Sequence, residues 1–226
     1  MKNLFIQSCQ ETKDNILGKK YRFKKLRPYM KFREQEILEE IFASLQPQNC
    51  LEWGSGHSTL YFPKLLPPQA KWSAIETDEV WRKRIVDLNQ SDRVNIYHVP
   101  WNNYPFSDAE KDGSYEDLKD YIDYPIKFAP FDFILIDGRA RRACLKKAMD
   151  IVTEEGVIIL HDANRKYYQA ELPAWQHQAL FTDFRRSAGG MWIGSKATPM
   201  AQLFDVSSHQ QKWEKLQNSF AKILNL

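Results

Sequence analysis

The 226-residue chain is 43% hydrophobic and carries a formal net charge of +3, so it can bury the core of one ordinary domain, which we assign to 1–226. So small a charge excludes a polycation built to neutralise nucleic acid. No apolar run approaches the roughly 20 residues of a membrane span or forms a signal peptide. Three scattered cysteines without a Cys/His cluster favour reduced thiols in the cytoplasm over a zinc site.

The first predicted element is an N-terminal arm and helix over 1–46. The segment from Lys19 to Arg33 is rich in Lys and Arg and contains no acid. It is either a solvated face or a contact for an acidic group, a phosphate or a membrane surface. Apolar residues then recur at helical spacing over 33–45, and Pro47 ends the helix.

Alternating strand and helix patterns fill 47–196. Apolar runs predict strands over 49–53, 71–76, 94–99, 131–136 and 157–160, and helices over 58–66, 79–89, 115–122 and 140–151. A hairpin is expected over 179–196, and a terminal helix over 209–226 within a tail from 197 to 226. Alternation of this kind is typical of a doubly wound, Rossmann-like α/β sheet. The long aromatic connection over 100–131 is of the kind that is functional or carries its own helix.

A Gly-rich turn joins the first core strand to its helix. Glu52 comes just before Gly54-Ser55-Gly56, and Ser58 and Thr59 stand where the helix should begin. A strand, a tight Gly turn and a helix N-terminus together form a nucleotide-cofactor loop. The dinucleotide pattern G-x-G-x-x-G is incomplete because Thr59 replaces its third Gly, and no Lys follows at P-loop spacing.

A second acid follows the next strand. Glu76 ends the apolar run over 71–75, and an acid about 20 residues past the Gly turn accepts hydrogen bonds from ribose hydroxyls in this class of fold. Asp78 is the competing candidate for that role. Capping of the following helix is the structural alternative.

The sequence Leu51-Glu52-Trp53-Gly54-Ser55-Gly56 closely resembles the first motif of class I S-adenosylmethionine-dependent methyltransferases. The segments 134–141 and 155–162 look like those of uncharacterised bacterial small-molecule methyltransferases. The resemblance implies a seven-stranded, mostly parallel sheet that closes with an antiparallel C-terminal hairpin strand. It also implies S-adenosylmethionine as cofactor. The expected cofactor-binding residues are Glu52, Gly54, Ser55, Gly56, Ser58, Thr59, Glu76, Trp101 and Asp137.

Chemistry is expected where the fourth and fifth core strands end. Asp137 follows one strand, and His161 and Asp162 follow the other. The carboxyl ends of neighbouring strands meet at one edge of an open α/β sheet. Asp137, His161 and Asp162 are therefore the candidate catalytic residues, and either Asp137 or His161 could act as the general base.

A divalent metal is an alternative at the same edge. Asp137, Asp162 and Asn164 partly resemble the ligands of cation-dependent O-methyltransferases and would suit magnesium. Ala163 separates the last two, and no Lys follows Asp137 closely, so the pattern departs from that family. The Arg residues at 139, 141 and 142 either hold an anionic substrate or lie on a helix surface.

The preferred function is methyl transfer to a hydroxyl or carboxylate oxygen of a small molecule. N-methylation of a small amine or peptide terminus and cofactor binding without catalysis remain alternatives, and a dinucleotide oxidoreductase is the least favoured. No nucleic acid partner is expected, because the chain has no Asn/Asp-Pro-Pro-aromatic tetrapeptide and no Cys placed as a cytosine nucleophile. The sequence leaves open the acceptor and whether the protein is a homo-oligomer.

Overall fold

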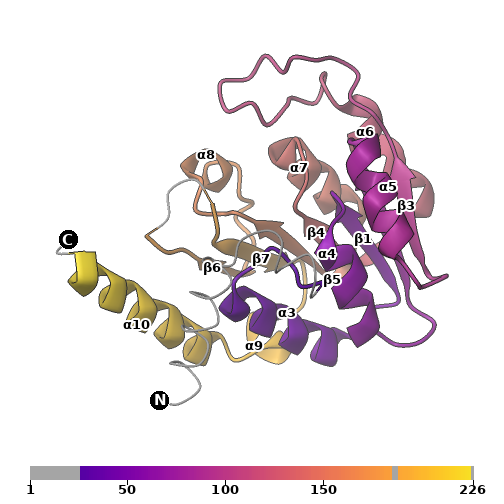
Figure 1. The fold of residues 1–226 in the computed structure, drawn as a ribbon. Helices are drawn as coiled ribbons and strands as arrows, with labels where there is room; N and C mark the ends of the chain where they lie inside the picture. Colours follow the sequence, from indigo (N-terminus) through magenta and orange to yellow (C-terminus); the bar gives the residue numbers. More distant parts are fainter. Residues whose placement is uncertain (1–25, 185–187, 225–226) are drawn as a thin grey trace.

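The computed structural model describes residues 26–184 and 188–224, with side chains as far as 215. Its centre is a seven-stranded sheet in the order β3-β2-β1-β4-β5-β7-β6 (Figure 1). The strands are β1 (Asn49–Trp53), β2 (Lys71–Glu76), β3 (Val94–His98), β4 (Phe131–Ile136), β5 (Val152–His161), β6 (His177–Phe181) and β7 (Met191–Ser195). Strand β7 runs antiparallel to β5 and β6, and the pairs among β1 to β5 are parallel. The predicted doubly wound sheet with an antiparallel C-terminal hairpin strand is confirmed.

Helices cover both faces of the sheet (Figure 1). They are α3 (Phe32–Leu45), α4 (His57–Tyr61), α5 (Glu79–Leu88), α6 (Lys119–Asp123), α7 (Arg141–Ile151), α8 (Lys166–Gln169), α9 (Met200–Leu203) and α10 (Val206–Leu224), with 3-10 turns η1 (Phe62–Leu65) and η2 (Tyr124–Phe128). None of these described helices is long and apolar enough to cross a bilayer.

Two separate hydrophobic cores follow from the alternation of side chains along the strands. Cys50 and Phe133 face one core, which also contains the apolar side of α3. Leu51 and Ile134, one position further along the same strands, face the other core with the apolar side of α7. Both faces of the central strands are thus buried, which explains why these strands are continuous apolar runs.

Several element bounds differ from the sequence predictions. The helix expected over 58–66 ends at Tyr61 and continues as η1, because Pro63 lacks the N–H that would continue the α-helix. Strand β5 begins at Val152 rather than 157 and has an irregular register against β4. The helices α8 and α9 were not predicted. Residues 19–25 of the basic segment, and the side chains of the terminal helix beyond 215, lie outside the described residues.

The connection between β3 and β4 contains α6 and η2 and is anchored beside the sheet. The backbone carbonyl of Asp112 accepts from Ala140 N–H at 2.7 Å, and its carboxylate accepts from Arg141 N–H at 3.0 Å. The first turn of α7 is therefore capped by the connection. Tyr121 of α6, which is 1% exposed, packs against the turn that follows β4. The connection thereby forms one wall of a cleft at the carboxyl ends of the strands.

Candidate functional site

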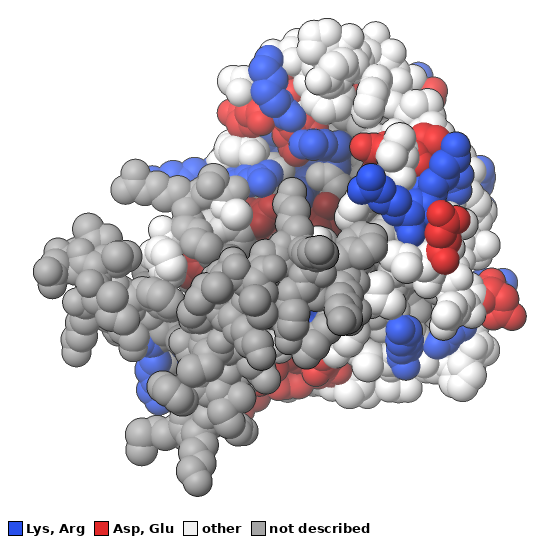
Figure 2. Space-filling view, viewed as in Figure 1, with Lys and Arg blue, Asp and Glu red and all other residues white. Residues whose placement is uncertain are grey.

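A cleft of about 430 Å³ lies at the carboxyl ends of β1, β2 and β4. Five residues predicted from the sequence to bind cofactor line it: Gly54, Ser55, Glu76, Trp101 and Asp137. This is the edge where open α/β sheets bind ligands, and the volume lies within the range of small-molecule sites. On the part of the surface that grey atoms leave uncovered in Figure 2, basic and acidic side chains are interspersed.

The turn after β1 needs Gly54. Its φ of 103° lies in the region that favours glycine, and a Cβ there would lie 3.0 Å from the carbonyl oxygen of Asp137. Gly56 differs, because its φ of 177° is ordinary extended backbone, and a Cβ there would meet only the Ser58 hydroxyl at 3.7 Å. The first glycine is therefore required by the backbone, whereas the second is not.

Glu52 is buried beneath this turn and holds it together. Its carboxylate accepts from Ser58 Oγ at 2.5 Å, Thr59 Oγ1 at 2.7 Å and Trp72 Nε1 at 2.9 Å. Thr59 Oγ1 in turn accepts from Gly56 N–H at 2.9 Å. Burial raises the pKa of Glu52 to about 7, although the three hydrogen bonds oppose the shift. Glu52, Ser58 and Thr59 thus bond to one another, and their predicted contacts with a cofactor stay predictions.

Glu76 ends β2 with its carboxylate fixed at the cleft. Oε2 accepts from Ser55 N–H at 2.9 Å and Ser55 Oγ at 2.8 Å, and Oε1 accepts from the N–H groups of Thr77 at 2.8 Å and Asp78 at 3.0 Å. The competing candidate Asp78 instead caps α5, accepting from Trp81 N–H at 2.9 Å. Glu76 therefore links the Gly turn to the end of β2.

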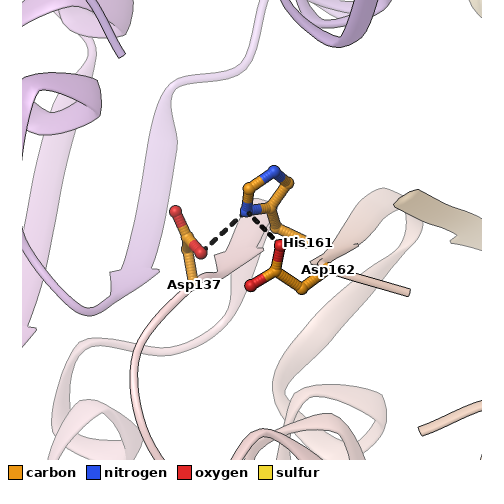
Figure 3. A group of neighbouring side chains, drawn as sticks. All are labelled: Asp137, His161 and Asp162. Atoms are coloured by element: carbon orange, nitrogen blue, oxygen red, sulfur yellow. Dashed lines mark hydrogen bonds and ion pairs between the residues drawn. The ribbon is translucent and has the colours of Figure 1, made fainter. Parts of the chain in front are cut away.

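Asp137 and His161 meet at the ends of β4 and β5 (Figure 3). His161 Nδ1 lies 2.9 Å from Asp137 Oδ1 and 3.9 Å from Asp162 Oδ1, and Nε2 lies 3.5 Å from Glu34 Oε2. Burial alone would lower the pKa of His161. The charges of Asp137 and Asp162 and the hydrogen bonds to Asp137 and Glu34 outweigh it, so the pKa lies well above its ordinary value. The raised pKa favours the protonated form of His161, which donates from both ring nitrogens and has no free lone pair for use as a base.

Asp137 lines the cleft, and one of its two carboxylate oxygens has no hydrogen-bond partner among the described residues. Oδ1 contacts His161 and Arg141 Nη2 at 3.1 Å, whereas Oδ2 is turned away from the imidazole (Figure 3) and accepts from no side chain or backbone group in the described part of the chain. The side chain is 22% exposed. Asp137 Oδ2 is therefore the carboxylate oxygen that can take a proton from a bound molecule.

Asp162 is enclosed by cations instead. Its Oδ2 lies 3.2 Å from Arg141 Nη1 and 3.2 Å from Arg165 Nη2, and Oδ1 accepts from Gly189 N–H. Burial raises the pKa of Asp162, but the charges of His161 and Arg141 and the Gly189 hydrogen bond outweigh it, and the pKa is lowered. Asp162 is accordingly a fixed anion within the protein.

The donor set fits a divalent metal poorly. Asp137, His161 and Asp162 each place one ligand atom within 4.8 Å of the others, but Arg141 already bridges the two carboxylates. The third expected ligand, Asn164, is turned elsewhere: its amide donates to Asp183 Oδ1 at 2.7 Å, and its oxygen accepts from Asp183 N–H at 3.0 Å. The predicted trio of metal ligands does not assemble.

Sequence reasoning missed several residues at the site. Glu34 in α3 reaches His161 and Gly190 N–H across more than a hundred residues of chain, which no local pattern signals. Trp81 and Arg165 line the cleft together with Tyr121 and Asp112. The last two come from the aromatic and acidic connection before β4, whose length was the available signal.

No protein-family model and no curated protein matches the chain, whereas many solved structures do. A methyltransferase-like protein from Silicibacter pomeroyi matches with a TM-score of 0.51 at 21% identity, over 83% of this chain and 96% of that one. The O-methyltransferase from Bacillus cereus, in complex with S-adenosylhomocysteine, matches with a TM-score of 0.51 at 19% identity, over 71% and 79%. The fold is that of the class I methyltransferases. A methyltransferase from Geobacter sulfurreducens also matches, with a TM-score of 0.52 at 14% identity, over 77% and 85%. Because one fold hosts many activities, the residues of the site and not the fold decide the function.

Proposed function

We propose that the chain is an S-adenosylmethionine-dependent methyltransferase that transfers the methyl group to an oxygen of a small molecule. The observation that carries the proposal is a single cleft joining the Gly54 turn, the fixed Glu76 carboxylate and the free oxygen of Asp137. The Bacillus cereus O-methyltransferase in complex with S-adenosylhomocysteine has the same fold, which supports the choice of cofactor.

Glu76 is assigned to the ribose hydroxyls. Each of its oxygens already accepts from two or more donors, so a ribose hydroxyl must share an oxygen or replace a donor. The Ser55 hydroxyl is the donor it would replace, because a side-chain hydroxyl can rotate while a backbone N–H cannot. Trp101, which is 42% exposed at the cleft, is assigned to the adenine.

Methyl transfer is an in-line displacement, for which the cofactor supplies a carbon activated by sulfonium. The acceptor oxygen forms the new bond to that carbon as the carbon–sulfur bond breaks, and the acceptor must lose a proton. Asp137 Oδ2 is the group assigned to receive it, which contributes a factor of about 100 to 10,000 when the base is well placed. His161 is assigned to hold Asp137 in position, as a protonated neighbour that donates to Oδ1.

The acceptor is proposed to carry an anionic group. Arg139 lines the cleft, its side chain is exposed, and no carboxylate pairs with its guanidinium among the described residues. A guanidinium binds a carboxylate or phosphate with two parallel hydrogen bonds. N-methylation is the second candidate, since the proton-accepting oxygen of Asp137 would serve a protonated amine equally well.

Cofactor affinity tests the proposal. Glu76→Ala should weaken S-adenosylhomocysteine binding roughly 10- to 100-fold, because charged hydrogen bonds of about 1.5–3 kcal/mol are lost. Glu79→Gln, three residues further on, is the matched control and should leave the affinity unchanged. Asp137→Asn should lower turnover far more than affinity. Equal affinity in Glu76→Ala and the parent protein would remove the ribose assignment.

The same titrations separate two roles for Arg139. If Arg139→Gln leaves the affinity for S-adenosylhomocysteine unchanged, the guanidinium is available for the acceptor. If that affinity falls while the affinity for 5′-methylthioadenosine, which lacks the carboxylate, does not, Arg139 holds the cofactor's amino acid end and the anionic acceptor is withdrawn.

A further inference from the structure

The two strand-end carboxylates already share a cation supplied by the protein itself. Arg141 Nη2 lies 3.1 Å from Asp137 Oδ1, and Arg141 Nη1 lies 3.2 Å from Asp162 Oδ2. These are the two acids that the sequence suggests as ligands of a divalent metal. One guanidinium thus spans the space between them.

The backbone fixes the guanidinium in this place. Arg141 Nε donates to the Gly138 carbonyl at 3.0 Å, Nη1 to the His161 carbonyl at 2.8 Å and Nη2 to the Asp137 carbonyl at 3.4 Å. These carbonyls belong to the ends of β4 and β5 and to the turn that leads into α7. The side chain is 9% exposed, so the surrounding backbone and side chains hold the guanidinium in one position.

The remaining groups leave no place for a second cation. Arg165 Nη2 lies 3.2 Å from Asp162 Oδ2, and His161 Nδ1 faces Asp137. Arg141, Arg165 and His161 therefore already contact the carboxylates of Asp137 and Asp162. A divalent ion needs several negative oxygen ligands turned toward it, and the contacting oxygens of these two acids are turned toward protein cations instead.

We propose that Arg141 stands in the position of a divalent metal, so that the cleft binds its ligands and positions Asp137 without one. Arg141 is a positioning residue: it draws Asp137 and Asp162 together and contacts Asp137 through Oδ1, so that Oδ2 of this cleft-lining residue stays unbonded. A guanidinium cannot be removed by a chelator or lost by deprotonation at ordinary pH. This inference concerns the cation between the carboxylates and does not rest on which acceptor is methylated.

Manganese binding tests the proposal directly. The full chain is titrated with Mn²⁺, and the free ion is followed by electron paramagnetic resonance. The parent protein should leave the Mn²⁺ signal equal to that of buffer, and chelator should not change S-adenosylhomocysteine binding. Arg141→Met removes the guanidinium at similar length and should create one Mn²⁺ site per chain, which Asp162→Asn in the same variant abolishes. Arg142→Met removes an equal charge one residue away and should bind no Mn²⁺.

Two results would overturn the proposal. One is a parent protein that binds one Mn²⁺ per chain and loses it in Asp162→Asn. The other is an Arg141→Met variant that folds, by circular dichroism, and binds none. If Arg141→Met does not fold, the parent and Asp162→Asn proteins still decide the question. A parent protein that binds neither Mn²⁺ nor S-adenosylhomocysteine would support Arg141 as the resident cation while removing the proposed methyl transfer.

Discussion

Replacing Glu52 by Gln should stabilise the protein at neutral and alkaline pH. Burial raises the Glu52 pKa from an ordinary 4.5 to about 7. Between these two pH values the folded protein keeps a proton that the unfolded chain has released. A carboxyl with a raised pKa contributes stability that is complete below the unfolded pKa and is lost as the pH rises through the folded one. A pKa displaced from 4.5 to about 7 corresponds to on the order of 3 kcal/mol of unfolding free energy.

An amide fits the place of this carboxylate. The Gln oxygen can accept from Thr59 Oγ1 and Trp72 Nε1, and its NH₂ can donate to Ser58 Oγ, because that hydroxyl can turn to accept. Glu52→Gln therefore keeps the hydrogen bonds and avoids the cost of burying a charge.

Urea unfolding of the parent and Glu52→Gln proteins at pH values near 5 and near 8 measures the effect. The difference in unfolding free energy, variant minus parent, should rise by about 2 to 3 kcal/mol between the two pH values. Glu79→Gln, an acid on the surface of α5, is the control. A difference that stays constant with pH, or falls, would show that Glu52 is ionised in the folded protein and would refute the reasoning.

Three further substitutions test the geometry of the site. Gly138→Ala places a Cβ 2.1 Å from Tyr121 Oη and should lower the free energy of unfolding in urea by about 1–3 kcal/mol. Gly56→Ala is the control and should leave the urea midpoint unchanged. Equal effects of the two substitutions would contradict the close approach of Gly138 to Tyr121. His161→Gln should lower the free energy of unfolding by about 3 kcal/mol, because Asp137 and Glu34 lose a buried partner. The loss should be largest below the unfolded His pKa and should shrink as the pH rises through the raised folded pKa. A loss that does not change with pH would argue against an imidazolium. Asp112→Ala should lower the free energy of unfolding by about 1 kcal/mol through loss of the cap on α7. Asp112→Asn keeps an oxygen that can accept from Arg141 N–H and should retain most of that stability. Equal losses in the two variants would contradict the capping role.

The sequence predicts those parts of the fold that depend on local patterns. The bounds of β1, β2 and β4 agree with the apolar runs that predicted them, because buried parallel strands are continuous apolar segments that turn residues and acids interrupt. Strand β5 starts earlier than predicted, because the polar run Thr153-Glu154-Glu155 looks like a turn although it lies within the strand, where the register against β4 is irregular. Composition alone does not distinguish a polar turn from a polar stretch within a strand.

The candidate site is predictable in position and less so in detail. The carboxyl ends of the strands bring Glu76, Asp137 and His161 to the expected edge, which follows from topology. The sequence does not show that Glu34 Oε2 faces Nε2 on the far side of His161, or that Arg141 lies between two carboxylates. Both depend on contacts between elements distant in sequence.

Calorimetric titration of the full chain with S-adenosylhomocysteine is the most direct test of the central proposal, with NAD titrated in parallel. We expect one S-adenosylhomocysteine to bind per chain with a dissociation constant in the micromolar range, the same heat with and without magnesium, and no heat with NAD. Absence of binding to S-adenosylhomocysteine at millimolar ligand, or tighter binding of NAD, would contradict the assignment of this cleft to a methyl donor.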